Sequence, residues 1–214
     1  MLLLLLWPCC GFPAKASSQP LRGGVAFVQQ LAETDQVTPN NQSDRMTNTL
    51  QIVELVNAFR TALGSLKGKV ALANADGRIV VRWQNPDSWL VQIDSYPDAP
   101  PEGLSIFVKT NGTVTVSLTK SGDSASVWLA TAKGGKADTK GKLRPEVAFQ
   151  RGMQHFGEHS KSVDLRDVRG CITLSRAAGN DGWFIDVSRF RNMHFGGTWI
   201  RVMDDGSLES MGGL

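Results

Sequence analysis

The strongest helical pattern in the chain lies between residues 50 and 67. Apolar side chains recur there at steps of three and four, which places them on one stripe of an α-helix, at Ile52, Leu55, Val56, Phe59, Leu63 and Leu66. Asn48 or Thr49 can cap the start of this helix, and Gly68 can end it. The pattern predicts one helix with a single buried face, and the polar stretch 34–49 before it predicts a loop.

From residue 69 onward, apolar and polar positions alternate, as is typical of a sheet with one covered face. The clearest two segments flank Asn111-Gly112, a dipeptide that favours a tight hairpin turn. Other turn-forming residues separate the remaining segments. The alternation predicts strands over 70–73, 78–84, 88–94, 104–110, 113–119 and 126–131.

The last third of the chain predicts a second helix and four more strands. Pro145 suits the first turn of a helix that runs to about His159. Short apolar segments follow at 171–174, 183–187, 198–203 and 207–211, with turn residues between them. The whole pattern predicts the α+β class, as a curved, half-barrel-like antiparallel sheet with one or two helices packed against it, in a single domain over residues 17–214.

Three tryptophans, Trp83, Trp89 and Trp183, fall on the apolar faces of their predicted strands. Two interpretations stay open. The wide side chains either fill a core beneath the helix or line a partly open hollow that holds an apolar ligand. Under the second interpretation, the ligand-binding wall consists of Trp83, Trp89, Val91, Ile93, Ile106, Val116 and Leu118.

Residues 1–16 have features of an export signal. The apolar run from Leu2 to Trp7 is far shorter than the roughly 20 residues that span a bilayer. Ala14-Lys15-Ala16 then supplies the small-x-small pattern that signal peptidase recognises. We expect cleavage after Ala16, export to the periplasm or the extracellular space, and no transmembrane segment.

Composition and charge exclude several classes of protein. The 214 residues are 41% hydrophobic and 20% charged, with a net charge of +3 at pH 7. These values exclude a disordered chain, a collagen-like repeat and a polytopic membrane protein. Because no basic stripe with interleaved aromatic residues is present, we expect no nucleic-acid partner. The Gly- and Lys-rich segment Lys133–Lys142 is a solvated loop or, alternatively, a peripheral contact with an anionic membrane.

The expected cleavage removes Cys9 and Cys10 and leaves Cys171. One cysteine cannot form an intramolecular disulfide, so the fold depends on its core. Cys171 begins an apolar strand, where we expect it to be buried as a small hydrophobic side chain.

Residues 51–119 resemble the LolA-like carriers of the bacterial envelope. The resemblance rests on the helix through Leu66, the strand Arg78–Arg82, the segment Asn85–Gln92 with its proline turn and aromatic strand, and Gly112 before Thr113-Val114. That family has a curved half-barrel whose hollow is covered by helices. The resemblance implies noncatalytic carriage of lipids or lipidated proteins, with no cofactor and no catalytic residue.

Two further functions compete with the carrier. His155-Phe156-Gly157-Glu158-His159 is an H-x-x-E-H string, the inverted zinc-protease arrangement. On a helix, His155 and His159 lie one turn apart, as two ligands of one Zn²⁺ require. His194 can supply the third ligand. Glu158 can act as the general base of a zinc-dependent hydrolase. The third possibility is a surface or assembly module whose sheet edges bind partners, which needs no internal hollow.

Overall fold

The computed structural model describes residues 39–73, 77–84, 86–123, 125–134, 139–160, 163–176, 180–191, 193 and 197–211, and residues 38–214 form one compact unit. Three helices and eight strands make up the described part of this unit. They are α1 (Pro39–Ser65), β1 (Gly77–Gln84), β2 (Ser88–Asp94), β3 (Leu104–Lys109), β4 (Val114–Leu118), α2 (Ser126–Thr131), α3 (Pro145–His159), β5 (Cys171–Arg176), β6 (Gly182–Ser188), β7 (Thr198–Met203) and β8 (Leu208–Met211).

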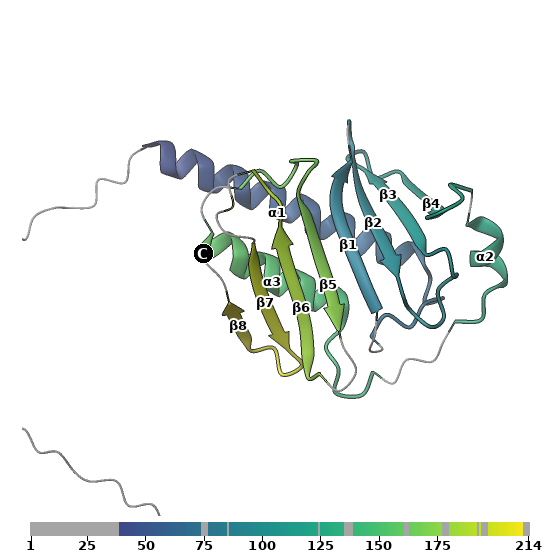
Figure 1. The fold of residues 1–214 in the computed structure, drawn as a ribbon. Coiled ribbons are helices and arrows are strands. Elements are labelled where there is room, and N and C mark those ends of the chain that lie inside the picture. The colour runs from purple at the N-terminus through teal and green to yellow at the C-terminus, as the bar shows by residue number, and fades with distance from the viewer. Residues whose placement is uncertain are drawn as a thin grey trace, which may run out of the picture. The chain divides into compact units, whose positions relative to one another are not determined.

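The eight strands form one curved antiparallel sheet that does not close into a barrel, in the order β4-β3-β2-β1-β5-β6-β7-β8 (Figure 1). The sheet consists of two four-stranded meanders. Each runs outward from the centre, and β1 pairs with β5 where the two meanders meet. The chain therefore passes from one edge strand, β4, through α2 and α3 back to the middle of the sheet. This architecture confirms the predicted α+β class.

Helices α1 and α3 cover one face of the sheet (Figure 1). The apolar stripe of α1 is buried against this face, and Phe59 stacks on Phe149 of α3 with 4.1 Å between the ring centroids. Gly152 lets α3 approach β6 closely, because a Cβ at this position would lie 2.2 Å from Cδ1 of Ile185. The core thus lies between one helical layer and one sheet.

The hydrophobic pattern predicted most element positions correctly. Helix α3 has the predicted bounds, and the hairpin across Asn111-Gly112 is present. The four late strands are also confirmed, with each end within two residues of the prediction. Trp83, Trp89 and Trp183 are all buried on the helix-covered face, as their alternation indicated.

Helix α1 begins at Pro39, so the predicted loop over 34–49 is wrong from that residue onward. Proline suits the first position of a helix, where no backbone donor is needed. Polar residues such as Asn and Thr lower helix propensity by only a few tenths of a kcal/mol each, roughly. Tertiary contact near the end of this polar stretch also favours the helix, since Asn48 is buried.

Two predicted strands are absent. In the segment 70–73, the N–H of Ala71 donates to the carboxylate of Asp98 rather than to a neighbouring strand, while Val70 is buried in the core. The segment 126–131 forms α2, with the N–H of Leu129 bonded to the carbonyl of Ala125. Six residues are too few for periodicity to separate a helix from a strand.

Cys171 is half-buried rather than part of the core. It lies on the sheet face opposite the helices, where its Sγ is 3.6 Å from the hydroxyl of Ser188. The reason is register: Ile172 and Leu174 take the covered face, so Cys171 takes the other. Among the described residues, no helix combines the length and the hydrophobicity that crossing a membrane requires.

Candidate functional site

The seven residues of the predicted binding wall share the covered face of the sheet. Their registers align across the four strands β1 to β4, for example Val91 with Ile106 and Ile106 with Val116. Trp89, Val91, Ile93 and Ile106 are at most 1% exposed, Trp83 is 6% exposed, and Val116 and Leu118 are half-buried on β4. These side chains pack into the core beside α1. A ligand therefore reaches this wall only if α1 moves, and a binding role for the wall stays a prediction.

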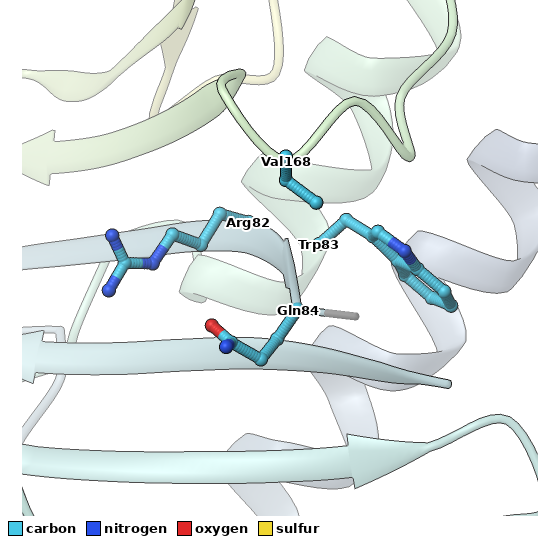
Figure 2. Close-up of a pocket in the computed structure, with 4 residues that line it drawn as sticks. All are labelled: Arg82, Trp83, Gln84 and Val168. Carbon is cyan, nitrogen blue, oxygen red and sulfur yellow. The ribbon is translucent and has the colours of Figure 1, made fainter. Parts of the chain in front are cut away.

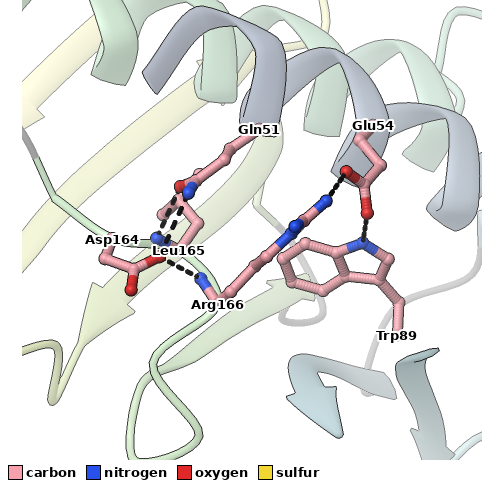
Figure 3. Close-up of polar contacts among 6 residues, drawn as sticks. All are labelled: Gln51, Glu54, Trp89, Asp164, Leu165 and Arg166. Carbon is pink, nitrogen blue, oxygen red and sulfur yellow. Dashed lines mark hydrogen bonds and ion pairs between the residues drawn. The ribbon is translucent and has the colours of Figure 1, made fainter. Parts of the chain in front are cut away.

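Trp83 lies where the covered face reaches the end of β1. Its ring meets Trp89 edge-on, with 5.1 Å between centroids, and the guanidinium of Arg166 lies 5.0 Å from the Trp83 ring. The indole N–H of Trp89 donates to Glu54 at 3.0 Å, and Arg166 forms an ion pair with the same carboxylate (Figure 3). We call Glu54, Trp83, Trp89 and Arg166 the Glu54 cluster.

The Glu54 cluster is part of a longer junction between α1 and the segment before β5. One turn earlier on α1, the amide of Gln51 donates to Asp164 at 3.1 Å and accepts the N–H of Leu165 at 2.9 Å (Figure 3). Because these contacts join residues more than 100 positions apart, they hold the segment 164–166 against α1. The Trp83 ring is therefore held by Trp89 of β2 and by Arg166 of this segment.

A pocket of about 360 Å³ opens in front of Trp83 and is lined by Arg82, Trp83, Gln84 and Val168 (Figure 2). We call it the Trp83 pocket. It exists because β1 is longer than its neighbour: the pairing with β5 ends at Val81 and Ile172, so the last three residues of β1 pair only with β2. Val168, which is 49% exposed, faces the edge of β1 that no longer pairs with β5.

The pocket combines an apolar interior with a cationic rim. Trp83 and Val168 are apolar, whereas Arg82 and Gln84 are exposed and lie on the opposite face of β1 from Trp83. Within the described residues, Arg82 has no ion-pair partner. Of these four lining residues, only Trp83 was predicted from the sequence to lie at a binding site. The sequence signal for Arg82 was its place at the end of the strand Arg78–Arg82, whereas Val168 lies too far from this strand in the sequence for a local pattern to show it.

A second cluster gathers near the end of α3. One ring nitrogen of His155, one of His159 and a carboxylate oxygen of Glu158 lie within 4.8 Å of one another, and the two rings are 4.2 Å apart. Burial lowers the pKa of His155 below its usual value; the neighbouring His159 lowers it further, while Glu158 raises it. This histidine cluster confirms the one-turn spacing that the sequence predicted. His194, the predicted third ligand, lies outside the described residues.

No protein-family model, curated protein or solved structure matches the chain. The resemblance to the LolA-like carriers therefore stays a prediction, as does the surface or assembly module. The export signal over residues 1–16 lies outside the described residues, and so do residues 135–138 of the basic segment Lys133–Lys142.

Proposed function

We propose that the chain is a noncatalytic binding protein for lipid-like amphiphiles, and that the ligand binds in the Trp83 pocket. The observation that carries this proposal is the pairing of an apolar recess with Arg82, a cation that has no ion-pair partner among the described residues. Binding sites for small molecules are mostly apolar recesses with a few polar groups that orient the ligand. A fatty acyl chain with an anionic end group has matching chemistry.

The pocket suits one acyl chain better than a large ligand. Its volume of about 360 Å³ is close to the lower end of the range of roughly 300–1,000 Å³ for ligand pockets. Trp83 and Val168 supply the apolar part of the lining, and the Glu54 cluster holds the buried Trp83 ring in one orientation. A fixed ring loses little conformational entropy when a ligand binds, which favours affinity.

Arg82 would select the end group of the ligand. A guanidinium can donate two parallel hydrogen bonds to a carboxylate or a phosphate. The exposed position of Arg82 lets such a group stay partly hydrated while the chain enters the recess. This arrangement fits a free fatty acid, whose carboxylate Arg82 would bind. The acyl group of a lipidated protein has no free carboxylate and would use only the apolar recess.

The test is a titration with a fluorescent fatty acid. We expect saturable binding to the wild-type chain, and about tenfold weaker binding to Arg82→Gln, since a charge-assisted hydrogen bond contributes about 1.5–3 kcal/mol. Arg78→Gln is the matched control: Arg78 lies on the same strand and the same face, but it pairs with Asp94. It should change the affinity less than twofold.

The proposal is wrong if the wild-type chain does not bind the probe, or if the two arginine variants bind equally. Native mass spectrometry of the purified full chain provides a second measurement, because a co-purified lipid would identify the natural ligand. Binding of an acylated peptide in addition to the free fatty acid would extend the ligand class to lipidated proteins. Export is tested separately by the N-terminus of the mature protein, which we propose to be Ser17.

A further inference from the structure

We propose that His155, Glu158 and His159 bind one divalent ion of the zinc class on the last turn of α3. These three residues form the histidine cluster, whose donor atoms all lie within 4.8 Å of one another. Spacings of three and four positions place all three side chains on one side of the helix. The site shares no residue with the Trp83 pocket, so each proposal can be tested independently of the other.

His159 is held in an orientation that suits a metal ligand. Its Nδ1 lies 2.9 Å from the backbone carbonyl oxygen of His155, one turn earlier. A carbonyl oxygen can only accept, so this contact places the ring proton on Nδ1 and leaves the lone pair of Nε2 available. Histidine ligands of metals commonly donate their other ring N–H to a carbonyl in this way.

His155 supplies the second observation. Its Nε2 is buried and has no hydrogen-bond partner among the described residues. A buried polar atom without a partner is rare in a folded protein and calls for an explanation, such as an ion. A cation coordinated jointly with His159, whose ring centroid lies 4.2 Å from that of His155, would give this nitrogen its partner.

Glu158 completes the donor set with an oxygen. Its carboxylate accepts a hydrogen bond from the amide of Gln154 at 3.0 Å, and one carboxylate oxygen lies within 4.8 Å of a ring nitrogen of each histidine. Donors around one Zn²⁺ at about 2.1 Å from the ion stand roughly 3.4 Å apart. Glu158 and His159 are exposed and can close the remaining distance by small side-chain rotations.

The position and the chemistry of the site select the class of ion. The carbonyl end of a helix carries a partial negative charge, which favours a cation. Two imidazoles and one carboxylate suit Zn²⁺, Ni²⁺ or Cu²⁺, whereas Ca²⁺ and Mg²⁺ prefer oxygen ligands alone. With three protein donors, at least one position on the ion stays open to water.

The test is equilibrium dialysis of the full chain against Zn²⁺ after chelation, followed by metal analysis. We expect one Zn²⁺ per chain and no retention of Mg²⁺. His159→Gln and Glu158→Gln should each weaken Zn²⁺ binding at least tenfold. Both residues are exposed, so neither variant should unfold the protein, and an unchanged melting temperature without metal checks this.

His194→Gln is the matched control, because it removes the remaining histidine of the chain. Zn²⁺ affinity should stay within about threefold of wild type, and Zn²⁺ should raise the melting temperature of this variant but not of His159→Gln. The proposal is overturned if the wild-type chain retains no stoichiometric Zn²⁺. It is equally overturned if His159→Gln binds as tightly as wild type, or if His194→Gln abolishes binding.

Discussion

Glu54 connects two residues that are distant in sequence, Trp89 and Arg166, and its removal should destabilise the fold. Glu54→Ala leaves the indole N–H of the buried Trp89 without an acceptor, and it also breaks the ion pair with Arg166. An unsatisfied buried donor costs about 1–3 kcal/mol, and an exposed ion pair contributes about 0.2–1 kcal/mol. We expect the free energy of unfolding, measured in urea, to fall by about 2 kcal/mol.

Glu54→Gln is the control for this prediction. The glutamine amide oxygen can still accept from Trp89, so only the charge on Arg166 loses its partner. The loss should stay below about 1 kcal/mol. If Glu54→Ala were as stable as wild type, Trp89 would be satisfied by another acceptor, and the Glu54 cluster would not hold α1 to the sheet.

Arg176 and Asp204 form an ion pair at the covered face of the sheet, and this pair should make stability depend on pH. Arg176 is only 3% exposed, and Asp204 also accepts the backbone N–H of Leu143 at 2.8 Å. The hydrogen bond from Arg176 lowers the pKa of Asp204 below its usual value, although burial opposes this shift. The stabilisation is therefore complete above the unfolded-state pKa of about 3.9 and is lost as the pH falls through the lower folded-state value.

Asp204→Asn tests this pair. At neutral pH, the variant should lose about 3–5 kcal/mol, because the buried Arg176 keeps its charge without a counter-charge. The difference in the free energy of unfolding between wild type and variant should shrink as the pH falls below about 4. A difference that stays constant with pH would show that Asp204 is not the group that titrates.

At the scale of elements, the sequence predicted a helix or strand correctly where a single hydrophobic period runs through the whole element. Helix α3 has a proline at its start and a continuous apolar stripe, so both its type and its bounds were predictable. Helix α2 is too short for its period to show, and the first part of α1 is polar, so no apolar stripe marks that part as a helix. Segment 70–73 is largely buried but pairs with no strand. Alternation alone does not distinguish such a buried irregular segment from a strand.

Gly152 determines how closely α3 packs on the sheet, and Gly152→Ala should destabilise the protein. Glycine in a helix normally costs about 1 kcal/mol relative to alanine, so helix propensity alone predicts the opposite. The new Cβ would meet Cδ1 of Ile185 at 2.2 Å, however, and overpacking of this kind costs about 1–3 kcal/mol. We expect a net loss of about 1 kcal/mol in urea unfolding.

Ile185→Val removes the methyl group that the new Cβ would meet, which provides a double-mutant cycle. Alone, this substitution should cost about 0.5–1.5 kcal/mol. Combined with Gly152→Ala, the two losses should be less than additive, because each change relieves the other. Strict additivity would mean that α3 shifts away from β6 rather than clashing with Ile185.

At the scale of the molecule, the sequence predicted the layers but not the order of the strands. Alternation shows that a face is covered, and this is why the buried side of Trp83, Val91 and Ile106 was predictable. It does not show whether a helix fills the space above that face, since the same alternation fits a hollow and a core. The Trp83 pocket depends on β1 being longer than β5 and on Val168, a residue 85 positions from Trp83. No local pattern contains this relation.

The strand order makes a prediction about the stability of the whole sheet. Each meander has its own edge strand, and β4 and β8 pair with one neighbour each among the described residues, whereas β1 and β5 lie at the centre. Side chains of β1 and β5 are fully buried on the covered face, while Leu208 on β8 is 39% exposed and β4 has no buried residue. Amides of β1 and β5 should therefore exchange hydrogen only through global unfolding, and those of β8 and β4 through local opening. Native-state hydrogen exchange measures this directly. If the protection of β5 were instead as low as that of β8, the two meanders would separate at the β1–β5 pairing, and the sheet would behave as two independent halves rather than as one cooperative unit.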